Sequence, residues 1–410
     1  MKETNNLRVE KHIVKSSNSF FNMLMDFCYK SKNLYNHANF IIRQEFIANR
    51  KWVRYAELDR ILKSDTEYND YAEMPTAQSA QQILRLIDKN WKSFFKSIKD
   101  WSIHKEKYLG KPKLPKYLKK DGKYLLILTN QNCKIEDGYV YFPKVFNGFI
   151  IKPKFIERED YKSFQQVRII PHKSNLTVEL IYSIDSCEKK IDNNRYIGID
   201  IGINNLAVVA NNIKDTAFII NGKPLKSINQ FYNKQISHYR EICKRMNDKD
   251  FSERMNKLTN KRNAKINDYL HKASRYIIRY CLTHNVHTIV IGKNKEWKQE
   301  SNMGKKNNQN FVQIPFSKFI EMMQYKAEEH GIVVILTEES YTSGTSFIDN
   351  EQTVKENYNK YRRIKRGLFK SNSGILINAD LNGAYQIIKK VVPIKWDREC
   401  ALHPFVVDMA

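Results

Sequence analysis

The sequence predicts a multidomain α+β protein. A short strand, a helical stretch and five closely spaced strands fill the first half, a pattern typical of an antiparallel β-barrel with a helical insertion after its first strand. In the second half strands alternate with helices, which indicates a parallel or mixed α/β sheet. A chain of 410 residues is long enough for two or three domains with cores of their own.

The elements of the first half follow from the spacing of apolar residues. Residues 7–14 predict a strand, and residues 17–48 repeat apolar side chains at the three- and four-residue intervals of a helix. Pro75 and Thr76 open a second helix, whose apolar stripe ends at Ile98. Further strands are expected at 124–129, 139–143, 149–153, 166–172 and 177–184.

A change in the sequence pattern near residue 191, from closely spaced strands to strands alternating with helices, marks the start of the second half. Residues 196–210 predict a strand, a turn and a second strand, and residues 225–286 predict strongly basic helices. The remaining elements are a buried strand at 288–292, a helix at 311–331 stopped by Gly331, a strand at 332–339, and a loop that becomes a helix at 377–392.

The charge balance points to a polyanionic partner. Lys and Arg number 70 against 44 Asp and Glu, a formal net charge of +26. Phosphate contacts release counterions, so a nucleic acid is the natural partner for such an excess. The basic residues proposed to contact it are Lys89, Lys92 and Lys96 in the second helix, Arg262 in the basic helices, and Arg363 and Arg366 in the stretch 360–370. A merely solvated basic loop is the alternative for that last stretch.

The spacing of the cysteines argues against disulfide bonds and against a structural zinc site. Six cysteines are scattered along the chain without a C-x-x-C pair, which predicts reduced thiols and neither a disulfide framework nor a structural zinc. The N-terminus lacks the apolar core of a signal peptide, and no apolar run has the length of a membrane span. We therefore expect a cytoplasmic protein with no membrane partner.

Carboxylates in three places suit metal chemistry. Asp200 interrupts an apolar strand, Glu338 and Glu339 end another, and Asp380 precedes a helix. Alone, Asp200 could form a turn and Asp380 could cap its helix. Together they offer the oxygen ligands that Mg²⁺ prefers, as a two-ion phosphodiesterase requires. No H-E-x-x-H or phosphate-loop motif is present, which argues against a zinc hydrolase of that type and against NTP hydrolysis.

Several long segments resemble the TnpB family, which small insertion sequences encode and which is related to compact type V CRISPR effectors. GIDIGINNLAVVA (198–210) resembles the first RuvC segment of that family. The other similar segments run in order along nearly the whole chain: QSAQQILRLIDKNWKSFF (78–95), GKPKLPKY (110–117), NGKPLKSINQFYNK (221–234), NDYLHKASRYII (267–278), IGKNKEWKQ (291–299), NNQNFVQIPF (307–316), EESYTS (338–343) and INADLNGAYQII (377–388).

The resemblance implies an RNA-guided DNA endonuclease of transposon origin. Residues 1–190 would form a wedge-type barrel with a helical recognition insert at about 16–105, which binds a guide RNA and reads a short motif beside the target DNA. Residues 191–410 would form an RNase H-like (RuvC) nuclease domain with a basic helical insertion at about 225–286 and a target-binding loop at about 340–372. Its cofactor would be two Mg²⁺ ions, with Mn²⁺ as the alternative. One chain per guide RNA, near the nucleoid of a prokaryote, is favoured, although the oligomeric state stays open.

Asp200 matches the first catalytic aspartate of the family and Asp380 the last, but the chain departs from the pattern twice. Many members have a glutamate where this chain has Gly292, and many carry two C-x-x-C pairs after the T-S motif, where this chain has no cysteine. The loop 342–370 must therefore be held by other contacts.

We predict that the missing glutamate has moved to the next strand. A strand–helix–strand crossover from 288–292 to 332–339 would place two parallel strands side by side, with ends about 5 Å apart. Glu339 is favoured over Glu338, because it lies nearer the open end of the strand. Glu296, in a predicted loop, is a weaker rival, and two plain surface charges are the remaining alternative.

Two other functions stay open. A nuclease-dead, RNA-guided DNA-binding repressor is favoured by Gly292 and opposed by the retained carboxylates. An RNase H-like DNA transposase is opposed by the long first half that resembles a guide-binding module.

Overall fold

The structure is a computed structural model. It describes residues 6–185, 187–188, 190–247, 251–293, 312–365, 367–395, 397 and 401–409. The chain divides into two compact units, Met1–Ser186 and Cys187–Ala410. None of the described helices is both long and apolar enough to cross a membrane.

The strands of the first unit form two antiparallel sheets. The larger sheet has the order β1-β7-β6-β2, and the smaller has the order β3-β4-β5. The strands are β1 (Asn6–Lys15), β2 (Leu126–Thr129), β3 (Lys134–Glu136), β4 (Tyr139–Tyr141), β5 (Ile150–Ile151), β6 (Tyr161–Pro171) and β7 (Asn175–Ile184). The prediction of one barrel is therefore corrected to two sheets. Pro143 and Pro153 lie two residues after β4 and β5, and a proline has no N–H with which to extend strand pairing.

Three helices lie between β1 and β2 in the chain. They are α1 (Phe21–Asn49), α2 (Tyr55–Ser64) and α3 (Ala77–Ile103). Thr76 caps α3, because its hydroxyl accepts from the Ser79 N–H at 3.0 Å while the Ser79 hydroxyl accepts from the Thr76 N–H. Trp91 of α3 is fully buried and donates its indole N–H to Asn39 of α1 at 3.1 Å. The apolar stripe of α3 thus packs into the core of this unit.

The second unit is built on a mixed sheet of six strands in the order β12-β11-β8-β9-β10-β15. Its strands are β8 (Tyr196–Asp200), β9 (Asn205–Asn211), β10 (Phe218–Asn221), β11 (Thr288–Gly292), β12 (Val333–Thr337) and β15 (Phe405–Val407). β8, β9 and β10 pair antiparallel, whereas β11 runs parallel to both β8 and β12. The α+β class and the mixed sheet predicted from the sequence are confirmed.

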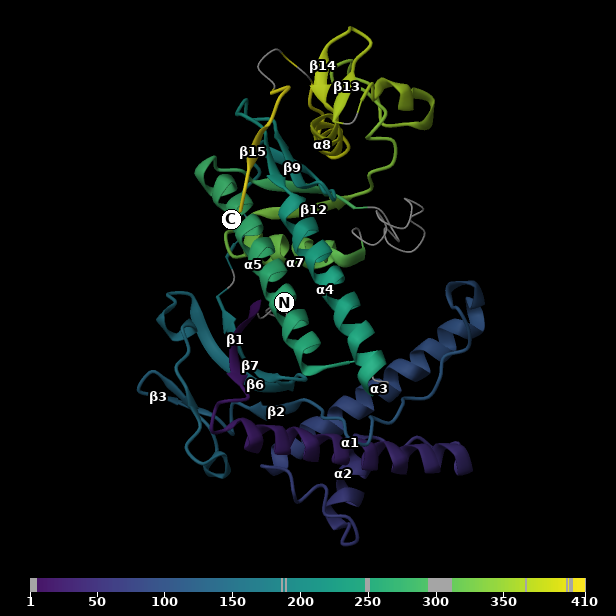
Figure 1. The fold of residues 1–410 in the computed structure, drawn as a ribbon, viewed down its shortest axis with the longest axis vertical. Helices are drawn as coiled ribbons and strands as arrows, with labels where there is room; N and C mark the ends of the chain where they lie inside the picture. The colour runs from purple at the N-terminus through teal and green to yellow at the C-terminus, as the bar shows by residue number, and fades with distance from the viewer. Residues whose placement is uncertain are drawn as a thin grey trace. The chain divides into compact units, whose positions relative to one another are not determined.

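Helices cover both faces of this sheet. The helices are α4 (Lys223–Asn247), α5 (Glu253–Thr283), α7 (Phe316–Glu328) and α8 (Ala379–Lys389), and α4 and α5 run side by side (Figure 1). α5 and α7 pack their apolar residues on one face of the sheet, and α8 packs on the other. A short hairpin of β13 (Leu368–Lys370) and β14 (Leu376–Asn378) leads directly into α8.

The crossover from β11 to β12 has the predicted geometry. The two strands pair in parallel, with Gly292 opposite Thr337. Gly331 has a φ of +68° between α7 and β12, a conformation that glycine adopts without steric cost. Both strands therefore end at the same edge of the sheet, where β8 also ends.

Candidate active site

Asp200 is the last residue of the central strand β8, and glycines bring helix α8 close to it. A Cβ atom at Gly198 would lie 2.4 Å from the Ala384 carbonyl oxygen, so only glycine permits this approach of helix and strand. A Cβ atom at Gly383 would lie 2.8 Å from an Asp200 carboxylate oxygen. The Asp200 side chain therefore points at the surface of α8, into space that is free because Gly383 has no side chain.

Asp380 lies in the first turn of α8 but does not cap the helix. Asn378 is the cap, because its side-chain oxygen accepts from the N–H groups of Asp380 at 3.0 Å and Leu381 at 3.1 Å. The Asp380 carboxylate accepts instead from Asn205 at 2.8 Å and from Arg363 at 3.1 Å. The capping role considered from the sequence therefore belongs to Asn378, and Asp380 faces Asn205 at the start of β9.

Glu339 occupies the space in front of Gly292. It follows the end of β12 by two residues, while Gly292 is the last residue of the neighbouring strand. A Cβ atom at position 292 would lie 2.4 Å from a Glu339 carboxylate oxygen and 2.5 Å from its Cγ atom. A side chain at position 292 and the present position of Glu339 therefore exclude one another.

Lys390 holds the backbone on both sides of Glu339. Its ammonium group donates to the carbonyl oxygens of Glu338 at 2.7 Å and Ser340 at 2.8 Å. The Glu338 side chain turns away, is exposed, and accepts from the Ser340 hydroxyl at 2.7 Å. Of the two adjacent glutamates, Glu339 is the one whose charge acts on Asp200.

The electrostatics of these carboxylates are unfavourable without a cation. Burial raises the pKa of Asp200 well above its usual range, and the charges of Glu339 and Asp380 raise it further, against a lowering by Arg363. Burial raises the pKa of Glu339 to about 7, although nearby Lys390 lowers it. Burial and the two neighbouring carboxylates thus disfavour the ionised form of Asp200, a cost that a bound cation would offset.

The donor set suits a hard divalent cation. Asp200, Glu339 and Asp380 supply only oxygen ligands, which Mg²⁺ and Mn²⁺ prefer. In the part of the chain that the structure describes, no three acidic, His or Cys side chains lie close enough together to hold a metal ion. The carboxylates interact through their charges, and a bound cation would have to draw them together. By the chemistry of its donors the site fits the expected magnesium.

The predicted nucleic-acid residues have different surroundings. Lys89, Lys92 and Lys96 are exposed on α3, where Lys92 pairs with Asp88 at 2.6 Å. Arg262 is tied within its own unit, because it donates to the Asn229 side chain and to the Gln313 carbonyl oxygen, each at 2.8 Å. That position favours a structural role for Arg262. Arg366 and Glu296 lie outside the described residues.

Asn205 and Lys390 had no assigned role in the sequence analysis, and Arg363 was expected to contact nucleic acid rather than a carboxylate of this site. Asn205 and Arg363 contact Asp380, and Lys390 holds the segment of Glu339. Asn205 lies 175 residues from Asp380, and Lys390 lies 52 residues from Glu338. Contacts over such separations leave no periodic signal in a single sequence.

Known families match the second half of the chain. Residues 176–298 match the model OrfB_IS605, described as "Probable transposase", and residues 316–387 match the model "Cas12f1-like, TNB domain". The chain thus carries a region of the OrfB_IS605 (TnpB) family. The first family model spans Asp200 and Gly292, and the second spans Glu339 and Asp380. No curated protein sequence matches the chain.

Solved structures of compact effectors are similar over most of the chain. A Cas12f1–sgRNA–target DNA complex is 14% identical, with a TM-score of 0.37 and coverage of 93% of this chain and 98% of that one. A CRISPR-Cas12f ternary complex is 16% identical, with a TM-score of 0.38 and coverage of 92% and 82%. CasPhi-2 (Cas12j) bound to crRNA is 10% identical, with a TM-score of 0.39 and coverage of 93% and 97%.

Proposed function

We propose that this chain is an RNA-guided, metal-dependent DNA endonuclease encoded by a transposon. The observation that supports it most directly is that the charges of two carboxylates act on a third, Asp200, at one edge of the mixed sheet. Asp200 comes from β8, Glu339 from the end of β12, and Asp380 from the start of α8. The match to the OrfB_IS605 family supports the guide RNA and the DNA target.

The order of the strands supports an RNase H-like, RuvC-type nuclease domain within 191–410. An antiparallel β8-β9-β10 meander is extended beyond β8 by β11 and β12, each parallel to its neighbour. In α/β sheets, sites form where the carboxyl ends of parallel strands meet. β8, β11 and β12 end at that edge, and the proposed site lies there.

Asp200, Glu339 and Asp380 would hold the metal in this proposal. Two bound Mg²⁺ ions would activate a water molecule and stabilise the leaving oxygen of the cleaved phosphodiester. The protein orients the ligands beforehand: Gly383 leaves room for the Asp200 carboxylate, Lys390 holds the backbone beside Glu339, and Asn205 donates to Asp380. Because the pKa values of Asp200 and Glu339 are raised, loading a cation would release protons from these side chains.

The guide and the target would bind to the abundant basic surface. The formal charge of +26 suits a polyanion, and Lys89 and Lys96 are exposed on α3. We assign guide and adjacent-motif binding to residues 1–190, a wedge-type fold with the helical insert, and cutting to residues 191–410. One chain per guide RNA at the nucleoid of a prokaryote completes this proposal.

A nuclease-dead repressor is the second function considered, and Gly292 is the feature in its favour. The position of Glu339 weakens that argument, because its side chain fills the space beside Gly292. A transposase, the description attached to the matching family, would require strand transfer by the same carboxylates.

Sequencing the RNA that co-purifies with the protein tests the proposal first. The expected result is one structured RNA species that contains a variable guide segment. A complex rebuilt with a chosen guide should then cut matching DNA in Mg²⁺, while the Asp200→Ala variant binds the same DNA without cutting. Binding without cutting by the unaltered protein would establish the repressor, and joined DNA strands would establish the transposase. Fully active protein free of RNA would overturn the guided mechanism.

A further inference from the structure

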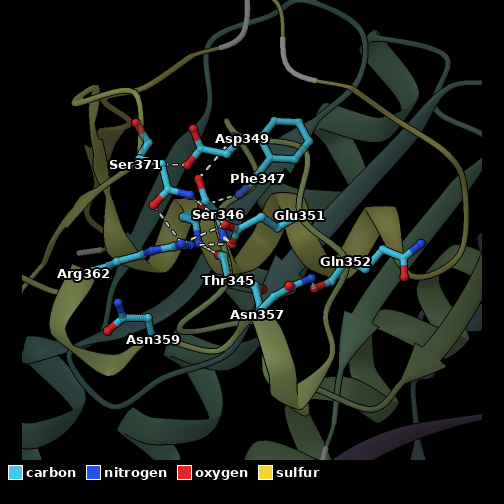
Figure 2. Close-up of polar contacts among 12 residues, drawn as sticks. Thr345, Ser346, Phe347, Asp349, Glu351, Gln352, Asn357, Asn359, Arg362 and Ser371 are labelled. Carbon is cyan, nitrogen blue, oxygen red and sulfur yellow. Dashed lines mark hydrogen bonds and ion pairs between the residues drawn. The ribbon is translucent and has the colours of Figure 1, made fainter.

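The segment between Glu339 and α8 is held by polar side chains. Residues 342–378 contain neither cysteine nor histidine. At the centre of the segment Arg362 forms a two-pronged ion pair with Glu351, one nitrogen lying 2.7 Å from Oε1 and the other contacting Oε2 (Figure 2). Each side chain is only 14% exposed, so water screens the pair weakly.

Further hydrogen bonds complete this ion pair. Asn372 donates to Glu351 at 3.0 Å and accepts from Arg362 at 2.8 Å, so it bridges the two charges. The Ser346 N–H donates to Glu351 at 2.8 Å (Figure 2). Asp349 accepts from the Asn372 N–H at 2.6 Å. We call Asp349, Glu351, Arg362 and Asn372 the clasp.

The charges of the clasp are stabilised in their ionised forms. Burial raises the pKa of Glu351, but hydrogen bonds from Arg362 and Ser346 lower it more, so the pKa lies below its usual value. Hydrogen bonds likewise bring the pKa of Asp349 below its usual value despite burial. A buried pair with satisfied hydrogen bonds defines one geometry, and removing one partner leaves the other charge uncompensated.

The segment is fastened to one face of α8. The buried Asn382 accepts from the Phe347 N–H at 2.9 Å and donates to the Thr345 carbonyl oxygen at 2.8 Å. One turn later Gln386 donates to the Thr345 hydroxyl at 3.1 Å, and the rings of Phe347 and Tyr385 stack with centroids 4.4 Å apart. Since Asp380 begins the same helix, the clasp and the proposed site share one rigid support.

Arg363 links the clasp to that site. It directly follows Arg362, and its guanidinium lies 3.1 Å from the Asp380 carboxylate. Of the cations near the three carboxylates, Arg363 is the one that lowers the pKa of Asp200. The Arg363 side chain is 41% exposed, so packing alone does not fix it, and a well-held backbone helps this contact to persist.

We propose that the clasp, through the Glu351–Arg362 pair, positions Arg363 against Asp380. In this inference, which rests on the proposed nuclease function, Glu351 and Arg362 are positioning residues that act through Arg363 and touch neither metal nor DNA. The side chains of the clasp then order this loop, which contains no cysteine or histidine. Its consequence is that cutting depends on Glu351, a residue in none of the three carboxylate positions.

Epistasis between Glu351 and Arg363 tests this proposal. Glu351→Gln should slow single-turnover cutting about 10-fold or more, the usual cost of losing a supporting contact, and leave target affinity within about 2-fold. Arg363→Gln should do the same, and the Glu351→Gln/Arg363→Gln double variant should be no slower than Arg363→Gln alone. Glu356→Gln removes the same charge from an exposed position in the same segment and should cut at the wild-type rate. Multiplying effects in the double variant would show that Glu351 does not act through Arg363.

Two measurements that do not depend on DNA cleavage separate this proposal from the proposed function. In metal-free protein, trypsin should cut after Arg363 and Lys365 faster in Glu351→Gln and in the milder Arg362→Lys than in the wild type or Glu356→Gln. Mn²⁺ affinity should shift in the same direction in Glu351→Gln and Arg363→Gln, with no further shift in the double variant. If the wild type never cuts, these results still decide the role of the clasp. Unchanged proteolysis together with unchanged Mn²⁺ affinity in Glu351→Gln would overturn it.

Discussion

The side chain of Glu339 lies against the backbone of Gly292, in the room that any larger residue at position 292 would need. The two residues end neighbouring parallel strands, and Gly292 pairs with Thr337, two residues before Glu339. One site for a carboxylate therefore exists in front of β11 and β12, and it is filled from β12.

Gly292→Ala should both destabilise the protein and impair cutting. The added methyl group would overlap Glu339, at a cost of about 1–3 kcal/mol in the free energy of unfolding. Chemical denaturation and a cleavage assay measure the two effects, with Gly110→Ala as the control because a Cβ atom there meets no neighbour. In the exchange variant Gly292→Glu/Glu339→Gly, cutting should return above the level of either single change. An exchange variant no better than its parents would argue against a shared carboxylate site.

Glu339→Gln should abolish cutting while target binding persists. The amide keeps the shape of the side chain but loses the charge that a divalent cation needs. Glu338→Gln is the matched control: its carboxylate is exposed and turned toward Ser340, so cutting should stay near the wild-type rate. Cleavage and binding assays with one guide would compare both variants with Asp200→Ala. Normal cutting by Glu339→Gln would remove this residue from the site.

The same substitution should stabilise the metal-free protein at neutral pH. Burial raises the pKa of Glu339 from 4.5 to about 7, so between these values the folded state holds a proton that the unfolded state has released. The free energy of unfolding of the wild type therefore falls as pH rises through this window, and Glu339→Gln should escape the fall. In EDTA, the free energies of unfolding of the two proteins should agree near pH 4, and above pH 7 that of the variant should be higher by about 1–3 kcal/mol. Identical melting curves at pH 7.5 would contradict the raised pKa.

Lys89→Gln and Lys96→Gln should weaken RNA binding through the salt-dependent part of the affinity. Each lost phosphate contact should reduce the slope of log K against log salt by about 0.7 for single-stranded RNA. Arg262→Gln should instead lower the melting temperature with the slope unchanged, because its guanidinium ties Asn229 to Gln313. A salt titration of RNA binding for the three variants distinguishes phosphate contacts from a structural role. An unchanged slope in both lysine variants would show that this face of α3 is simply solvated.

The sequence was informative about elements whose signal is local. Apolar spacing predicts α1 and α3, and chain order predicts the parallel pairing of β11 with β12. The two sheets of the first unit were not predicted, because the pairing partners of short strands are decided by packing between distant segments. β13, β14 and β15 have three residues each, too few to show a period.

Only the site residues that lie at the ends of predicted strands could be recognised from the sequence. Asp200 and Glu339 stand at the ends of apolar runs, where a sheet presents side chains to one edge. The clearance at Gly383 and Gly292 was not predictable, because it depends on how closely α8 and a neighbouring segment approach. The Arg363–Asp380 contact depends on the fold of the whole intervening loop, which the clasp orders.

The parallel register of β11 and β12 also bears on how such a site evolves. Because neighbouring parallel strands finish at one edge, selection can conserve a carboxylate in space while its position in the alignment changes. A chain with a glutamate at both positions would need the Glu339 side chain turned aside, because a Cβ atom at position 292 would overlap its present position. A survey that compares only the residues at one aligned position would classify such a protein as an inactive nuclease, because it would miss a carboxylate supplied by the neighbouring strand.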